Sequence, residues 1–467
     1  MCSQKKGKSI CPILAQADRS FTQGSICPLL PGLGIMLSLP DTLVLLHGAV
    51  GCGSCAHGNN VNIRVGNSVR GRPSGDALWL SSALDEINVI NGGDEKLARA
   101  LVEADKLYHP KVIIVVSGCL PGVIGDDIDA VSAKVQDEVS AKILSVHCEG
   151  FKSRFMATAY DVVYHALGRG LMPEPSEVKT KDQKRINVMN VGSMGLGDEK
   201  ELGRLIGEIG LEANFFPVFA HPESLRKAAS ASLSVSICPT HDDYFLSHLE
   251  EKYSIPYIIR HMPIGIKNTS RWLEGVGEAM GLASEAKKVA RAEEKELGEA
   301  LKGYKEFFKG KRAFLSAGEY RSLATASLLK ELGFQIVAIR SFHYDGFADV
   351  EIEKLTKDSS EEIVFNVANV QPFEEANLLK RLKPDIFLGH WHGNSTAARL
   401  GIPTQVIYNS GYGYMGYQGA FDLARRIERR LKHPFFYKRL ETEGRLSYRK
   451  SWYAKDPFSK IRSYEAL

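Results

Sequence analysis

The sequence lacks several features that would assign it to common protein classes. No apolar run reaches the roughly 18 residues that a membrane span requires, and prolines interrupt the apolar stretch from Cys27 to Leu46. No loop of the form G-x-x-x-x-G-K followed by Ser or Thr is present, so the chain is not expected to hydrolyse ATP itself. The basic residues 1–9 are not followed by a hydrophobic region with a cleavage site. We therefore expect a cytoplasmic protein without a membrane partner.

The sequence also has little excess charge. Its 467 residues carry a formal net charge of +4, with both signs mixed along the chain, so no nucleic-acid partner is expected. Low-complexity tracts and short repeats are absent. At roughly 150 residues per domain, the length predicts about three domains.

Short apolar runs alternate with longer helical periods in three successive segments. The strand-like runs are 41–47, 111–117, 185–192, 233–237, 256–260, 311–316, 334–340, 385–389 and 404–408, and the main helical stretches are 93–106, 198–209, 242–253, 284–308, 323–333 and 374–382. This alternation is typical of βαβ units with parallel sheets. We therefore predict an α/β fold of three Rossmann-like domains, at 1–180, 181–309 and 310–467, with a ligand pocket between them. Ligands of such sheets bind beyond the carboxyl ends of the strands.

Three of the eight cysteines stand in turn-like surroundings. Cys27 precedes a proline, Cys52 lies between two glycines, and Cys119 follows a glycine and precedes Leu-Pro-Gly. Glycine lets backbone N–H groups approach the sulfides of an iron–sulfur cluster. Zinc sites use closely paired cysteines, and the single pair formed by Cys52 and Cys55 has no second pair. Disulfides are a poor explanation in a large cytoplasmic chain. Spacing alone leaves cluster ligands and ordinary buried cysteines as equal alternatives.

Local sequences around these cysteines resemble the nitrogenase component 1 family, in its α-type subunit. The motifs are HGAVGCGSC around Cys52, SGCLPGVIGDDI at 117–128, VHCEGF at 146–151 and INVINGGDEKL at 87–97. The resemblance extends from about Cys27 to Arg439. It implies that Cys27, Cys52 and Cys119 bind a relay cluster shared with a homologous β-type subunit in an α2β2 complex. That cluster would be a P-cluster of the 8Fe-7S type, or a 4Fe-4S cluster as in the tetrapyrrole-reducing branch. Electrons would come from a separate ATP-dependent iron protein that carries a 4Fe-4S cluster.

Cys238 follows the strand-like run LSVSI. Its surroundings are similar to the segment in which one cysteine of the family holds an end of the active-site iron–sulfur–carbide cofactor. A core cysteine at a strand end is the alternative. The resemblance therefore implies that Cys238 is a metal ligand of a nitrogenase-type cofactor, whose heterometal the sequence does not define.

The opposite end of that cofactor is held in the family by a histidine before a Gly-Tyr pair, and Met415 occupies this position here. A thioether is a soft ligand that suits iron, although a packing role for Met415 is favoured. His390 and His392, just after the run DIFLG, are alternative ligands. Hydrogen bonding within the site is the competing interpretation for both histidines.

Two further residues bear on the reaction. Tyr160 stands where nitrogenases carry a histidine that delivers protons, and a phenol with a pKa near 10 is a poor proton shuttle at neutral pH. Arg321 matches a family arginine beside the cofactor and would offer fixed donors to sulfides or to an organic acid. An ordinary surface arginine is an equal alternative for Arg321.

These replacements favour a reductase whose small-molecule substrate is not mainly dinitrogen. Within the family they best suit the methylthio-alkane reductases, which cleave carbon–sulfur bonds, and Phe155, Met156 and Tyr160 would line an apolar pocket for such thioethers. The alternatives are a non-catalytic scaffold for cofactor assembly, a tetrapyrrole reductase and the α subunit of an alternative nitrogenase.

Overall fold

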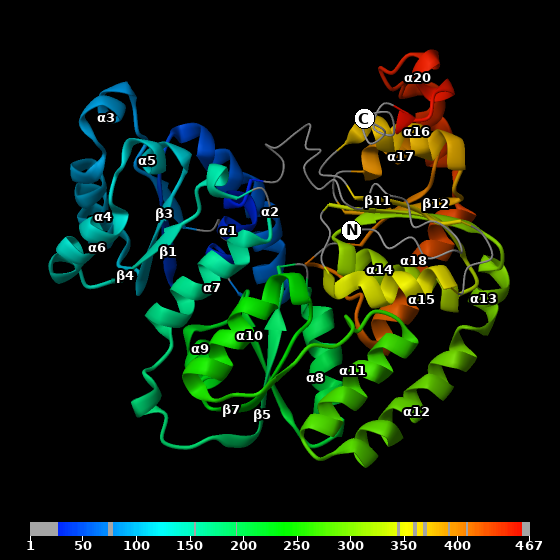
Figure 1. Cartoon of the computed structure of the whole chain (residues 1–467), viewed down its shortest axis with the longest axis horizontal. Helices are drawn as coiled ribbons and strands as arrows, with labels where there is room; N and C mark the ends of the chain where they lie inside the picture. Colours follow the sequence, from blue (N-terminus) through cyan, green and yellow to red (C-terminus); the bar gives the residue numbers. More distant parts are fainter. Residues whose placement is uncertain are drawn as a thin grey trace, which may run out of the picture.

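The computed structural model describes residues 27–72, 78–153, 156–192, 194–342, 346–357, 362–367, 371–390, 393–407 and 410–459. It contains three parallel sheets, which form three lobes in Figure 1. The predicted α/β fold with parallel sheets is therefore confirmed. No helix in the described ranges is both long and apolar enough to span a membrane.

The first sheet has the strand order β2-β1-β3-β4. Its strands are β1 (Thr42–His47), β2 (Trp79–Ser81), β3 (Val112–Ser117) and β4 (Lys142–His147). Every residue of β3 is buried, as expected of a central parallel strand covered on both faces. The accompanying helices are α1 (Leu29–Met36), α2 (Gly53–Val69), α3 (Glu86–Asn91), α4 (Asp94–Tyr108), α5 (Cys119–Ile124), α6 (Ile128–Val135) and α7 (Thr158–Leu171).

The second sheet has the order β6-β5-β7-β8. Its strands are β5 (Asp182–Asn190), β6 (Glu212–Pro217), β7 (Ala231–Val235) and β8 (Tyr257–Ile258). The helices around it are α8 (Leu196–Glu208), α9 (Pro222–Ala228), α10 (Pro239–Tyr253) and α11 (Ile266–Ala279). The predicted charged helix at 284–308 is two helices, α12 (Ala283–Ala300) and α13 (Lys302–Phe308), which lead to the third lobe (Figure 1).

The third sheet has the order β11-β10-β9-β12-β13. Its strands are β9 (Arg312–Ala317), β10 (Gln335–Ser341), β11 (Val364–Val367), β12 (Ile386–Gly389) and β13 (Thr404–Val406). The helices are α14 (Glu319–Glu331), α15 (Asp349–Lys357), α16 (Pro372–Leu382), α17 (Asn394–Arg399), α18 (Gly416–Lys432), α19 (Phe435–Glu443) and α20 (Lys450–Ala454).

Hydrophobic cores join the middle lobe to both neighbours. One core packs Val188 and Trp272 of the second lobe with Leu315 of the third. Another packs Val163 of α7 with Phe216 of the second lobe. Because both junctions are buried hydrophobic contacts, strand ends from all three lobes are held in fixed positions around the space between them.

Candidate functional site

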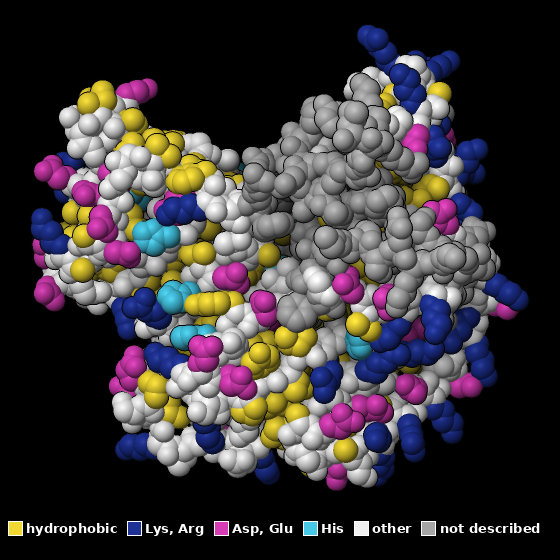
Figure 2. Space-filling view, viewed as in Figure 1, with side chains coloured by type: hydrophobic (Ala, Val, Ile, Leu, Met, Phe, Trp, Pro, Cys, Tyr) yellow, Lys and Arg dark blue, Asp and Glu magenta, His cyan; other side chains and the backbone are white. Residues whose placement is uncertain are grey.

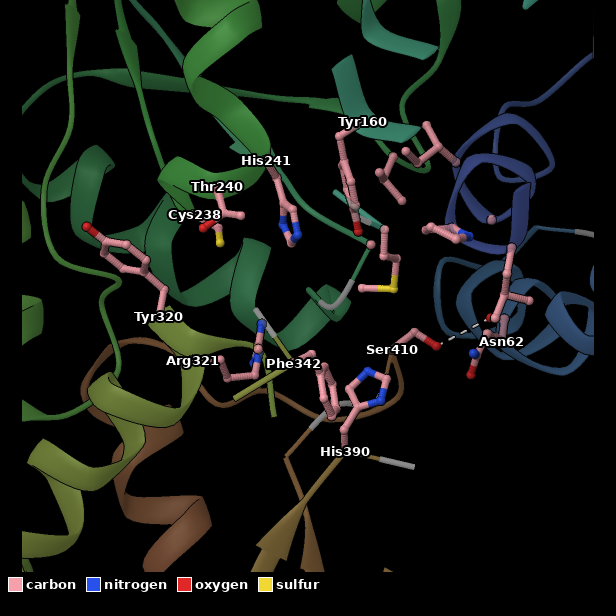
Figure 3. Close-up of a pocket in the computed structure, with 18 of the residues that line it drawn as sticks. Asn62, Tyr160, Cys238, Thr240, His241, Tyr320, Arg321, Phe342, His390 and Ser410 are labelled. Atoms are coloured by element: carbon pink, nitrogen blue, oxygen red, sulfur yellow. Dashed lines mark hydrogen bonds between the residues drawn. The ribbon is translucent and has the colours of Figure 1, made fainter. Parts of the chain in front are cut away.

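A cavity with about 1040 Å³ of empty space lies where the three lobes meet. The first lobe contributes Ile35 and Tyr160, the second contributes Cys238, and the third contributes Arg321 and His390 (Figure 3). Four residues predicted as site residues from the sequence are therefore brought together here. Most of the remaining wall is apolar, including Leu30, Pro31, Ile63, Met156, Val218, Phe219, Met262 and Phe342.

The backbone around Cys238 is fixed by one buried carboxylate. β7 ends at Val235, and Cys238 caps α10, whose first residue is Pro239. Asp242 Oδ2 accepts hydrogen bonds from the backbone N–H groups of Ile237 and Cys238, both at 2.8 Å. Burial raises the pKa of Asp242 to about 7. The thiol is buried and faces the cavity (Figure 3).

Arg321 lies on α14 and is buried rather than on the surface. Its Nη1 donates a hydrogen bond to the carbonyl of Ile407 at 3.2 Å, and its guanidinium carbon lies 5.8 Å from the ring centroid of Tyr414. A charged group is costly to bury unless its donors have acceptors. Arg321 is therefore held at the cavity wall with a fixed orientation.

Met415 and His390 differ in their positions. Met415 is fully buried and is not among the residues that line the cavity. Its backbone N–H donates to Asp198 Oδ1 at 2.8 Å. His390 follows β12 and lines the cavity, where its ring meets Phe342 edge to face at 5.6 Å. His392 lies outside the described residues.

Tyr160 stacks on a histidine that the sequence interpretation did not single out. The rings of Tyr160 and His241 are 3.9 Å apart with an interplanar angle of 13°, and both line the cavity (Figure 3). His241 stands one helical turn after Cys238, and its backbone N–H donates to the Cys238 carbonyl at 2.8 Å. That spacing places both side chains on one face of α10, a signal that the sequence does contain. Met156 lines the cavity, whereas Phe155 lies outside the described residues.

Cys27, Cys52 and Cys119 gather at a second place, at the carboxyl edge of the first sheet. A Cβ added at Gly150 would lie 2.8 Å from Cys27 Sγ and 3.4 Å from Cys119 Sγ, and one added at Gly118 would lie 3.7 Å from Cys52 Sγ. All three cysteines are only partly buried. Burial, together with the neighbouring thiols, raises the pKa of Cys52.

Two more cysteines lie beside these three. Burial raises the pKa of Cys55 to about 11 and that of Cys148 to about 12, and in both groups Cys27 contributes to the shift. Such thiols are neutral at physiological pH unless a metal replaces the proton. The donor set is thus rich in sulfur and close to glycine backbone.

Buried hydrogen bonds connect the loops that carry Cys52 and Cys119. His47 ends β1, and its Nε2 lies 3.0 Å from Asp126 Oδ2, just after the Cys119 helix. Its Nδ1 lies 3.0 Å from Ser82 Oγ. The backbone N–H of Gly118 donates to the His47 carbonyl at 2.9 Å. The loops that carry Cys52 and Cys119 are therefore held in register.

Large apolar side chains are exposed around the three cysteines. Val50 is 67% exposed, Val123 72% and Phe151 55%. Each is one to four residues from Cys52, Cys119 or the Gly150 contact. Figure 2 shows further apolar side chains over the same lobe. Exposed apolar side chains that cluster on a surface mark a place where another molecule can bind.

Among the described residues, no three His, Cys, Asp or Glu side chains are arranged to enclose a single metal ion. A cluster of several irons is held by cysteine thiolates that are spread more widely than the ligands of a single ion. The three partly exposed cysteines beside two glycines fit such a group, and so does the buried thiol that faces the interlobe cavity.

Comparison with known proteins places the chain in a family. The family model described as Nitrogenase component 1 type Oxidoreductase matches residues 27–432. The cofactor biosynthesis protein NifE of Methanococcus maripaludis is 27% identical over 93% of this chain and 89% of its own length. The nitrogenase molybdenum-iron protein alpha chain of Methanosarcina barkeri is 25% identical over 85% of this chain and 83% of its own length. A solved structure titled Nitrogenase Cp1 at pH 5 shares the fold with a TM-score of 0.74 and 21% identity, covering 92% of this chain and 91% of its own. The chain, with its cysteine-lined edge and its interlobe pocket, belongs to the nitrogenase component 1 type oxidoreductases as an α-type member.

Proposed function

We propose that the chain is the catalytic α-type subunit of an iron–sulfur reductase that cleaves the carbon–sulfur bond of small methylthio-alkanes. The observation that carries the proposal is the largely apolar interlobe cavity, which holds the Cys238 thiol and the Arg321 guanidinium together. A soft, apolar thioether suits such a wall better than a strongly hydrated substrate does. The products of the two-electron, two-proton reaction are an alkane and methanethiol.

Two groups of residues would hold the metal clusters. Cys27, Cys52 and Cys119 would bind a relay cluster, with further ligands from a homologous β-type subunit. Cys238 would bind one end of the active-site cofactor, and His390 is better placed than Met415 for the other end because it lines the cavity. When bound, these clusters supply low-potential electrons, which an ATP-dependent iron protein provides. Arg321 would orient an anionic group of the cofactor through its fixed donors.

The pocket also contains groups that can hold protons. Tyr160 is a weak acid at neutral pH, but His241 adds an imidazole against its ring. Two protons are needed for each carbon–sulfur bond cleaved, fewer than dinitrogen reduction requires. Tyr160 and His241 would also form a flat wall against which a methylthio group packs.

A product assay tests the proposal. The purified complex, supplied with its iron protein and ATP, is expected to release methanethiol from small methylthio-alkanes and to form little ammonia under dinitrogen. Both products are measured at the same electron flux. Abundant ammonia without thiol would instead establish an ordinary nitrogenase.

A cofactor-assembly scaffold is the second candidate. It is favoured by the position of Met415, which leaves the cavity without a ligand at the family's histidine position. The similarity to a cofactor biosynthesis protein agrees with this alternative. A scaffold would carry the cofactor but give neither thiol nor ammonia, and it would release the cofactor to an apo-reductase.

A further inference from the structure

A second cavity, with about 1380 Å³ of empty space, opens between the end of α2 and the second lobe. Its wall includes Arg70, Arg72, Lys200 and Lys227, which come from the turn after α2, from α8 and from α9. Val218 and Phe219 line both this cavity and the interlobe pocket. Nothing in the proposed reaction uses this cationic cavity.

One of the cations is already neutralised. Arg70 forms a short ion pair with Glu199, which also accepts a hydrogen bond from Asn190. The other face of the Arg70 guanidinium lies 4.3 Å from the centroid of the Phe219 ring. The second carboxylate on the wall, Glu212, lies 3.5 Å from Arg185. Both acids of the cavity therefore already form an ion pair, with Arg70 and with Arg185, and only the charge of Glu199 also acts on Arg72.

Arg72, Lys200 and Lys227 form no ion pair within the ranges that the structure describes. Lys200 and Lys227 are exposed at the rim, whereas Arg72 reaches inward. Its Nη1 is buried and meets no acceptor among the described residues. Burial, and then the proximity of Arg70, lowers the pKa of Arg72, and the charge of Glu199 opposes this shift in part. A buried guanidinium N–H without an acceptor costs free energy that a ligand oxygen would recover.

We propose that this cavity binds a small polyanion of the phosphoryl class, held by Arg72 with Lys200 and Lys227. A phosphoryl group brings about two negative charges and several acceptor oxygens, which match one guanidinium fork and two ammonium groups. A monocarboxylate would leave most of the positive charge uncompensated. The site does not depend on the proposed reaction, because none of these three residues lines the interlobe pocket.

Inorganic pyrophosphate is the probe for this site, and acetate is the monovalent comparison. Isothermal titration of the purified protein is expected to show saturable pyrophosphate binding, weaker at high salt, and no saturable acetate binding. Arg72→Gln is expected to weaken pyrophosphate binding by about tenfold or more, and Lys227→Met by a smaller factor. Lys288→Met removes an exposed lysine on α12 away from the cavity and is expected to change nothing.

Several outcomes would overturn the proposal. The first is the absence of saturable pyrophosphate binding. The second is equal pyrophosphate affinity of Arg72→Gln and the wild-type protein. The third is an equal loss of pyrophosphate affinity in Lys288→Met and Lys227→Met. If Arg72→Gln does not fold, the double variant in which the exposed Lys200 and Lys227 are both changed to Met decides the question, because these side chains form no ion pair with any described residue. Loss of binding in the double variant supports the site, and unchanged binding refutes it. Product assays are not involved, so a failed reductase proposal leaves this test intact.

Discussion

A glycine on α2 allows the wall between the two cavities to form. A methyl group at Gly66 would lie 2.1 Å from Cζ and 2.5 Å from Cε1 of Phe219. The Phe219 ring has little room to move away from Gly66, because the Arg70 guanidinium lies over the ring. The backbone of Phe219 is also held, since its N–H donates a hydrogen bond to Ser38 Oγ at 3.0 Å. Phe219 also has a φ of 56°, a left-handed conformation that its surroundings must maintain.

Gly66→Ala should therefore destabilise the chain despite the better helix propensity of alanine. Overpacking lowers the free energy of unfolding by about 1–3 kcal/mol. Replacing glycine by alanine in a helix interior raises it by about 1 kcal/mol. Gly58→Ala is the matched control on the same helix, because no atom lies within 4 Å of its added Cβ. That control should gain about 0.5–1 kcal/mol.

Urea unfolding, monitored by circular dichroism under one protocol, measures the difference in stability between these variants and the wild type. We expect the midpoint of Gly66→Ala below that of the wild type and that of Gly58→Ala at or above it. Adding Phe219→Leu to Gly66→Ala should restore part of the loss, giving a coupling of about 1 kcal/mol between the two sites. A Gly66→Ala variant as stable as Gly58→Ala would refute the packing argument.

The remaining predictions concern the two sites and a buried acid. Cys52→Ala should lose the relay-cluster iron and electron transfer, and normal iron content with wild-type turnover would exclude the ligand role. Cys238→Ser should lose the signal of the pocket cofactor in electron paramagnetic resonance but keep the relay cluster, so an unchanged cofactor spectrum would contradict it. Burial and the charge of Asp243 raise the pKa of Asp161 to about 7. Because the unfolded value is near 4, the folded chain binds this proton more tightly, and its stability should fall as pH rises from about 4 to about 7. Asp161→Asn should lack that fall in urea midpoint, and an unchanged pH profile would show that Asp161 does not cause it.

The central strands could be predicted from the sequence because they are continuous apolar runs, as in β1 and β3. The sequence pattern does not predict β6, because a buried asparagine and a terminal proline interrupt its apolar run. It does not predict β2, β4 or β11 either, because these strands are short or begin with charged or half-exposed residues. The charged helix divides at Leu301, between Gly298 and Gly303, and these two glycines are a weak helix-breaking signal that the prediction of one continuous helix does not take into account.

Residues of the candidate site could be predicted from the sequence where a reactive side chain directly follows a predicted strand, as Cys238 and His390 do. His241 can be predicted only if its spacing of three residues from Cys238 is recognised as one turn of a helix. The burial of Met415 could not be read from the sequence, because Asp198, 217 residues away, fixes its backbone. The cationic cavity likewise depends on a distant pairing, in which Glu199 binds Arg70 and Arg72 Nη1 has no hydrogen-bond acceptor in the described ranges.

An anomalous-scattering map at the iron edge, from crystals of the purified complex, tests the central claim most directly. We predict one group of iron peaks beside Cys27, Cys52 and Cys119 at a subunit boundary. A second group should lie in the interlobe cavity, with one end at Cys238 and the other near His390. Iron at neither place, or a single mononuclear peak at the three cysteines, would contradict the account.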